Sequence, residues 1–289
     1  MKISTILNSG KPILSFEVFP PKNADNLAAI FEASRSIAKL GPDFMSITYG
    51  AGGSNAGYAQ QLAAYLQNDC HITALAHLTC VSSSSDTIHA ELEAFRAAGI
   101  RNLLALRGDV PDGSSYPQNA SYLYAYQLVE EIRRFDADFC IGAACYPEGH
   151  VECPSKDQDL LHLKHKVEAG CDFLTTQMFF DNAVLYGFLY RMLAQHIDVP
   201  VIAGIMPVTN VRQIRRSCEL SGATLPPRFK SILDKFGGDE AAMRQAGIAY
   251  ATEQIIDLIA NGVRGVHVYV MNKPEVAAAI AANVSEIIK

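Results

Sequence analysis

The segment Asn102–Asp109 reads NLLALRGD, a short apolar run that ends in an arginine, a glycine and an aspartate. A run of this length is typical of a strand that is buried on both faces of a parallel sheet. In folds built from such strands, ligands bind beyond the C-terminal ends, where the polar residues of this segment stand. The segment therefore predicts one strand of an α/β fold and part of its active site.

Seven other apolar runs have the same form, and nearly every one ends in a polar or ionisable residue. They are Ile13–Val18, Asp43–Thr48, Ile72–Leu78, Phe139–Ala144, Phe173–Gln177, Val199–Ile205 and Val266–Met271. Amphipathic stretches with helical spacing fill the gaps, and several end in a capping glycine: Gly41, Gly99, Gly170 and Gly262. Eight alternations of strand and helix predict a (β/α)8 TIM barrel.

The chain of 289 residues is close to the size of one such barrel, which typically has about 250 residues. Hydrophobic residues make up 49% of it, enough for a large core. We expect a single catalytic domain over residues 1–289 and no regulatory domain. The long interval between Ile205 and Val266 has room for about two helices and a loop, so an inserted helical segment is expected between strands 7 and 8.

Charge and cysteine content narrow the class of protein. The net charge of −6 argues against nucleic acid or an anionic membrane surface as a partner, and no segment has the roughly 18 apolar residues of a membrane span. The cysteines number seven, with no C-x-x-C pair, which indicates a reducing cytoplasm. Cys145, His150 and Cys153 lie close together but lack the paired spacing of a zinc site, so no metal is predicted.

Glu17 is the first candidate for chemistry. It lies between Phe16 and Val18 at the end of the first run, where we expect its carboxyl to be partly desolvated. Desolvation raises a carboxyl pKa and suits the group to general-acid catalysis. The alternative is an interior glutamate that pairs with a basic side chain for structural reasons.

Arg107, Gly108 and Asp109 are the second candidate. Glycine permits a close approach of ligand to backbone, and the arginine fork suits a phosphate or a polarised carbonyl. The alternative is an internal Arg–Asp ion pair at the rim.

A third group follows the middle strands. His77 ends the third run, where a lone histidine can also be a satisfied core residue. Asp159, His162 and Lys166 are spaced three and four apart, so they share a helix face that is either a phosphate-binding patch or simply solvated. Gln177 ends the sixth run and can offer both a donor and an acceptor to a heterocycle. No dinucleotide-binding or P-loop glycine fingerprint is present.

Seven segments, in family order and spanning most of the chain, resemble the methylenetetrahydrofolate reductase family in its short, single-domain bacterial form. They are residues 15–22 (SFEVFPPK), 46–51 (SITYGA), 76–80 (AHLTC), 106–109 (LRGD), 146–150 (YPEGH), 176–181 (TQMFFD) and 204–208 (GIMPV). The resemblance implies a barrel that binds FAD without a Rossmann module. It also implies ping-pong reduction of 5,10-methylenetetrahydrofolate to 5-methyltetrahydrofolate, with NADH or NADPH reducing the flavin before the folate enters the same face.

The resemblance also assigns roles. Glu17 would protonate the folate and open its imidazolidine ring to an iminium, and the negative charge of Asp109, between flavin and pterin, would stabilise that iminium. FAD would be held by Thr48, Tyr49, Ala51, His77, Arg107, Gly108, Asp109, Tyr124, Ala125, Tyr146, His150, Asp159, His162, His165 and Lys166. The folate would contact Glu17, Asp109, Gln177, Gln213 and Lys273.

Two positions depart from the better-known bacterial pattern. Lys273 stands where an arginine often meets the substrate, and Ser217 where a bulky apolar residue often packs. These departures leave the electron donor open: free NADH or NADPH, or an iron–sulfur protein that reduces the flavin. A homo-oligomer is expected. The rival classes are a flavin-free barrel lyase or aldolase that grips a phosphorylated substrate, and a barrel that only binds folate.

Overall fold

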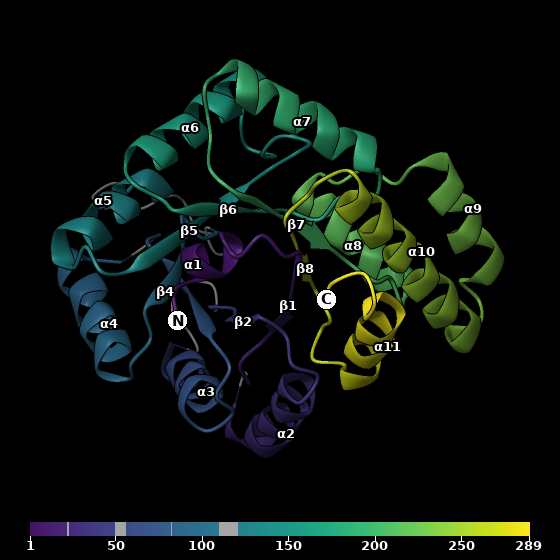
Figure 1. The fold of residues 1–289 in the computed structure, drawn as a ribbon, viewed down its shortest axis with the longest axis horizontal. Coiled ribbons are helices and arrows are strands. Elements are labelled where there is room, and N and C mark those ends of the chain that lie inside the picture. The colour runs from purple at the N-terminus through teal and green to yellow at the C-terminus, as the bar shows by residue number, and fades with distance from the viewer. Residues whose placement is uncertain (22, 50–55, 82, 110–120) are drawn as a thin grey trace.

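A computed structural model describes residues 1–21, 23–49, 56–81, 83–109 and 121–289. Parallel strands close into an eight-stranded barrel in chain order, and helices surround it (Figure 1). The strands are β1 Ile13–Val18, β2 Phe44–Ile47, β3 Ala74–Thr79, β4 Asn102–Leu106, β5 Cys140–Cys145, β6 Phe173–Thr176, β7 Val201–Ile205 and β8 Gly265–Val268. This confirms the predicted (β/α)8 barrel, with strand ends displaced by no more than a few residues.

The helices fill the intervals between strands. They are α1 Ile3–Leu7, the short 3-10 helix η1 Ala24–Asn26, α2 Leu27–Ala38, α3 Ala56–Asn68, α4 Ser85–Ala97, α5 Ala125–Phe135, α6 Lys156–Glu168, α7 Asn182–Ala194, α8 Val211–Ser221, α9 Pro227–Phe236, α10 Glu240–Ala260 and α11 Pro274–Val284. The four glycines expected to cap helices all have positive φ, between 70° and 106°. In the part of the chain that the structure covers, no helix is both long and apolar enough to cross a bilayer.

Alternation along the strands separates the two faces of the barrel wall. On β1, Phe16 and Val18 belong to the cluster that packs against the surrounding helices, whereas Ile13 belongs to the cluster that fills the barrel near its N-terminal end. Because side chains alternate along a strand, Ser15 and Glu17 share the interior face with Ile13. The inside of the barrel is therefore apolar near its N-terminal end and polar toward the C-terminal ends of the strands.

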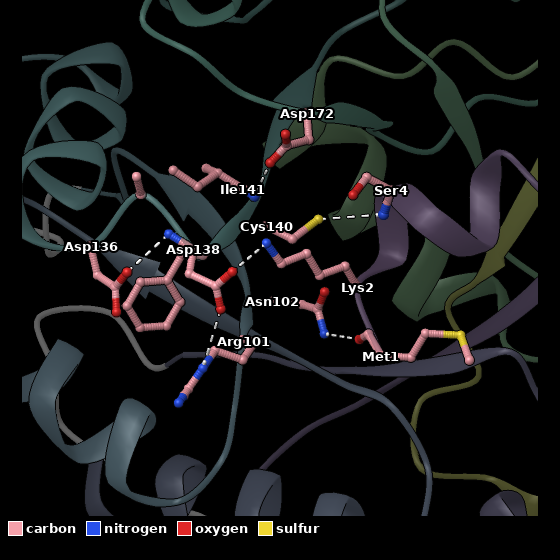
Figure 2. Close-up of polar contacts among 12 residues, drawn as sticks. Met1, Lys2, Ser4, Arg101, Asn102, Asp136, Asp138, Cys140, Ile141 and Asp172 are labelled. Atoms are coloured by element: carbon pink, nitrogen blue, oxygen red, sulfur yellow. Dashed lines mark hydrogen bonds and ion pairs between the residues drawn. The ribbon is translucent and has the colours of Figure 1, made fainter.

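Helix α1 closes the N-terminal end of the barrel, which the sequence did not predict. Its Ile3 and Leu7 are fully buried in the interior cluster. The side chain of Asn102 at the start of β4 accepts from the backbone N–H of Ile3 at 2.8 Å and donates to the carbonyl of Met1 at 3.0 Å. Figure 2 shows the contact between Asn102 and Met1 beside the Lys2–Asp138 ion pair, whose charged atoms are 2.6 Å apart. These contacts lie at the end of the barrel opposite to the polar strand exits.

Three helices, α8, α9 and α10, occupy the interval between β7 and β8. The sequence predicts about two helices and a loop in this interval. That one of these helices is an insertion into the barrel stays a prediction. They pack around a cluster of their own that includes Ile214, Phe229 and Met243. Helix α8 begins close to the end of β7, so it lies at the C-terminal rim of the barrel.

Candidate functional site

A cavity of about 350 Å³ opens beyond the C-terminal ends of β4 and β5. It brings together eight of the residues predicted to hold a cofactor: Arg107, Tyr124, Ala125, Tyr146, His150, Asp159, His162 and Lys166. They come from the exits of β4 and β5, from the N-terminal end of α5 and from α6, along which Asp159, His162 and Lys166 follow one another. The shared helix face predicted on α6 is therefore a cavity wall.

Lys166 and Asp159 are the half-buried charges of this wall. The ammonium of Lys166 donates to the carbonyl of Ala144 at 2.5 Å and lies 5.8 Å from the centre of the Tyr146 ring. Burial lowers the pKa of Lys166, and it raises the pKa of Asp159 although Lys166 and a bond from the His150 N–H oppose the latter shift. The wall can thus offer a positive charge in a partly desolvated place, as an anionic ligand group requires.

Arg107 already has a carboxylate partner in this structure. Its guanidinium lies 2.5 Å from Glu152, which is more than half exposed and whose pKa the arginine lowers. This is not the internal Arg107–Asp109 pair considered above. An anion that binds Arg107 must displace the Glu152 carboxylate or share the guanidinium with it. Because Glu152 is exposed, this ion pair contributes little free energy, and breaking it costs little.

Aromatic rings form the outer edge of the cavity. Tyr124 stacks on His162 with ring centres 5.0 Å apart, and Tyr126 meets His165 edge to face. The Nδ1 atom of His162 is buried and has no hydrogen-bond partner among the described residues. A flat ligand with a polar edge fits such a surface, because the rings supply contact area and His162 supplies an unused polar atom. The donor set therefore suits a dinucleotide with a diphosphate.

Glu17 lies inside the barrel in a second group of buried polar residues. Its carboxylate oxygen Oε2 accepts from the Ser46 hydroxyl at 3.3 Å and is 3.6 Å from the Nε2 atoms of both His77 and His267. The side chains of Glu17, His77 and His267 are exposed by 10% or less. Strands β1, β2, β3 and β8 each contribute one residue to this Glu17 group.

The expectation that the Glu17 pKa is raised is wrong for the free protein. Burial raises the pKa of Glu17, but its contacts with His267, His77 and the Ser46 hydroxyl together hold this pKa below its usual value. The reason is strand alternation. Phe16 and Val18 point to the helices, so polar side chains rather than these apolar ones surround the carboxylate.

His267 has a serine hydroxyl beside each of its ring nitrogens. The Ser15 hydroxyl lies 2.7 Å from Nδ1 of His267 and 3.1 Å from the carbonyl of Val266. On the other side of the ring, Nε2 faces the Ser46 hydroxyl at 2.9 Å. His267, Ser46 and Glu17 thus form a chain along which a proton can pass. In contrast, burial lowers the pKa of His77 to about 4, so His77 is neutral at pH 7.

Other predicted cofactor contacts do not line the cavity. The Tyr49 hydroxyl donates to Glu91 on α4 at 3.4 Å, His77 belongs to the Glu17 group, and His165 is exposed. Asp109 is exposed, but its charge, after burial and the charge of Asp159, helps to raise the pKa of Tyr146. Thr48 and Gly108 stand at the exits of β2 and β4, and Ala51 lies outside the described residues.

The predicted folate contacts stand at the exits of β6, β7 and β8. Gln177 uses its amide oxygen to accept from the N–H of Met178 at 2.9 Å, and Lys273 donates to the Thr209 hydroxyl at 2.7 Å. Gln213 is exposed on α8 and Ser217 is half-buried one turn later. Lys273 therefore ties the exit of β8 to that of β7.

The sequence analysis missed Ser15, Ser46, His267 and Glu152. A period of two from Glu17 leads back to Ser15, so interior alternation could have found that residue. Ser46 and His267 come from other strands, and only the register of the barrel brings them to Glu17: Glu17 is the partner of Ser46, and Ser15 of His267.

Comparison with known proteins gives the family of this chain. The sequence model of the methylenetetrahydrofolate reductase family matches residues 2–285. An Arabidopsis thaliana protein named methylenetetrahydrofolate reductase (NADH) 1 is 33% identical over 98% of this chain, which spans about half the length of that relative. The Escherichia coli 5,10-methylenetetrahydrofolate reductase is 32% identical over 94% of this chain and 90% of its own.

Among solved structures, an uncharacterised Clostridium thermocellum protein, described as binding two copies of 5-methyl-5,6,7,8-tetrahydrofolic acid, has a TM-score of 0.64 and 16% identity. The alignment covers 99% of this chain and all of that one. At this identity the likeness concerns the fold alone. The family match over nearly the whole chain and the identity to the bacterial enzyme lead to one conclusion: this chain belongs to the methylenetetrahydrofolate reductase family.

Proposed function

We propose that this protein reduces 5,10-methylenetetrahydrofolate to 5-methyltetrahydrofolate, with FAD as the resident cofactor and NADH or NADPH as the electron donor. The observation that carries the proposal is the Glu17 group, a buried carboxylate connected to a histidine at the C-terminal end of a barrel of this family. The names of the relatives support the substrate, and the plant relative's name supports NADH.

The cavity walls would hold FAD. Arg107 and Lys166 would meet the diphosphate with positive charge, and the stacked rings of Tyr124 and His162 would contact a flat ring. His150, whose N–H is bonded to Asp159 at 3.3 Å, would fix the turn between these residues. When bound, FAD supplies a carrier for a hydride between the nicotinamide nucleotide and the folate.

Glu17 would give a proton to the folate when the imidazolidine ring opens. Its pKa is lowered in the free protein, so the carboxyl needs a source from which to take that proton. Ser46 and His267 would relay that proton: a His267 imidazolium would give its Nε2 proton to Ser46 as Ser46 gives its own to Glu17, which leaves the ring neutral. The exposed carboxylate of Asp109 would then stabilise the positive charge that develops on the substrate.

The test separates the two half-reactions. In Glu17→Gln the side chain keeps its size but cannot give a proton. Reduction of bound FAD by NADH or NADPH should survive, because it needs no acid, whereas folate turnover should fall by about 10²- to 10⁴-fold. Stopped-flow absorbance of the flavin measures each half separately.

Glu131→Gln is the matched control. Glu131 is also a buried glutamate paired with a histidine, His89 at 2.6 Å, but it lies on α5 outside the barrel, so both half-reactions should be retained. Equal losses in both halves for Glu17→Gln would make Glu17 structural. A protein that retains no FAD on a desalting column would refute the cofactor. Flavin that dithionite reduces but NADH and NADPH do not would instead indicate a protein electron donor.

A further inference from the structure

Strand β1 parts from β8 close to Glu17. The paired residues of the two strands end with Phe16 and Val268, one residue before Glu17. At the start of this pairing, the N–H of Ile13 donates to the carbonyl of the residue that precedes β8. Every second N–H of a strand faces the same neighbour, so the N–H of Phe19 is directed to this side too. It lies beyond the last paired residues and takes its partner from the turn that follows β8.

The side chain of Asn272 takes the place of the next backbone pair. Its oxygen accepts from the Phe19 N–H at 2.8 Å, and its nitrogen donates to the Phe19 carbonyl at 3.0 Å. A carboxamide carries the same kinds of donor and acceptor as a peptide group, so it can replace one. The two residues after Phe19 are prolines, which have no N–H. Phe19 is therefore the last residue before them that can be held through both its backbone groups.

The turn that carries Asn272 is itself fixed in place. Met271 and Asn272 both have a left-handed backbone, with φ of 55° and 54°. Asparagine adopts this conformation more readily than most residues, whereas methionine has no such preference. On the far side of the turn, the N–H of Lys273 donates to the carbonyl of Val270 at 3.0 Å, and its ammonium donates to the Thr209 hydroxyl at 2.7 Å. The carboxamide therefore holds Phe19 from an anchored support.

We propose that Asn272 is a positioning residue that fixes Glu17 for proton transfer to the folate. This inference rests on the proposed function, which makes Glu17 the acid. Phe19 is two residues beyond Glu17, so a bond to both its backbone groups fixes the course of β1 where the carboxylate projects. A general acid must lie within hydrogen-bond reach of the atom that it protonates, and a displacement of about 1 Å can cost about a hundredfold in rate.

The experiment measures both half-reactions of Asn272→Gly by stopped-flow absorbance of the flavin. Glycine permits the left-handed backbone, so the substitution removes the carboxamide without adding strain. The folate half-reaction should slow by about 10- to 100-fold. Reduction of bound FAD by NADH or NADPH should survive, because it needs no acid. A residue that only stabilised the fold would not separate the two half-reactions in this way.

A double variant shows whether Asn272 acts through Glu17. In Glu17→Gln the acid is already absent, so the addition of Asn272→Gly should slow the remaining folate half-reaction by no more than about twofold. Two losses that multiply would place the effect of Asn272 elsewhere and overturn the proposal. If Asn272→Gly does not fold, Asn272→Asp takes its place in both measurements. An ionised aspartate keeps the size and the acceptor but cannot donate to the Phe19 carbonyl.

Met271→Gly is the matched control. It places a glycine at the neighbouring left-handed position and leaves the Asn272 carboxamide in place, so both half-reactions should keep their wild-type rates. A wild-type rate of folate reduction in Asn272→Gly, or an equal loss in both half-reactions, would overturn the positioning role and leave the proposed function standing. Failure of the unmodified protein to reduce the folate at all would refute the proposed function, and the positioning role with it.

Discussion

Glu17 owes its surroundings to residues on three other strands. Phe16 and Val18, its neighbours in sequence, face the helices, whereas Ser46, His77 and His267 face its carboxylate. A carboxyl that is buried among polar partners keeps its charge, whereas one buried among apolar side chains loses it. The acid chemistry of Glu17 therefore depends on a proton supplied by its partners.

His77 makes the stability of the protein depend on pH. Folding lowers its pKa from 6.5 to about 4, so the unfolded chain takes up a proton first as the pH falls. The contribution is fully present above pH 6.5 and is lost as the pH falls toward 4, a change of about 3 kcal/mol. We expect the free energy of unfolding in urea to fall between pH 7 and pH 4.5, and His77→Gln to flatten this part of the profile.

His196→Gln is the comparison for that profile. His196 is an exposed histidine on the outside of the barrel, and its replacement should leave the wild-type pH dependence. A His77→Gln profile parallel to wild type would show that His77 does not lose its charge on folding.

Helix α10 is held against the loop after β7 by a glycine. A Cβ on Gly247 would lie 1.7 Å from the carbonyl oxygen of Val208, a backbone atom that cannot move aside as a side chain can. Val208 directly precedes Thr209, the partner of Lys273. This contact therefore links the position of α10 to the rim of the site.

Gly247→Ala should destabilise the protein by about 1–3 kcal/mol through overpacking and should raise the KM for folate by displacing the Thr209 loop. Gly238→Ala is the paired variant, because a Cβ there meets nothing within 4 Å; we expect it to be neutral or slightly stabilising. Urea denaturation and steady-state kinetics of the two variants measure both effects. Equal stabilities would mean that α10 moves away from Val208 at no cost.

Closure of the barrel brings its first and last strands together at the site. Strand β1 pairs with β8, and the Asn272 side chain both accepts from the Phe19 N–H at 2.8 Å and donates to the Phe19 carbonyl at 3.0 Å. The exits of the first and last strands are thereby fixed together. Tyr269 lies beside the Glu17 group, with its ring centre 5.4 Å from that of His267, and its hydroxyl donates to the carbonyl of Thr176 at 2.7 Å.

Binding of FAD should stabilise the whole barrel. A ligand at 100 times its Kd adds about 2.7 kcal/mol. For a domain of this size that corresponds to a rise in Tm of roughly 4–5 °C. Lys166→Met, which removes a half-buried charge from the cavity wall, should lose most of this rise. Lys164→Met on the same helix, outside the cavity lining, should keep it. Differential scanning calorimetry with and without FAD measures the shift, and equal shifts in both variants would remove Lys166 from the FAD site.

The order of strands and helices and the polar exits could be predicted from the sequence, because buried parallel strands are short continuous apolar runs whose ends must carry the polar residues. Arg107, Tyr146, His150, Asp159, His162 and Lys166 could be grouped for the same reason: they follow strands β4 and β5, which are neighbours in the barrel. The local apolar pattern, together with the rule that strand ends meet at one rim, was sufficient to predict the residues of the cavity beyond β4 and β5.

Only the tertiary structure decided which side chains surround Glu17, because these contacts depend on the pairing register of strands far apart in sequence. Ser46 and His267 reach it through the β1–β2 and β1–β8 registers, which an apolar pattern does not encode. The same holds for the plug formed by α1, whose five residues are too few to form a stable helix alone and gain stability from burial of Ile3 and Leu7 in the barrel. Sequence determined the barrel and its rim, and packing determined the electrostatic environment of the acid.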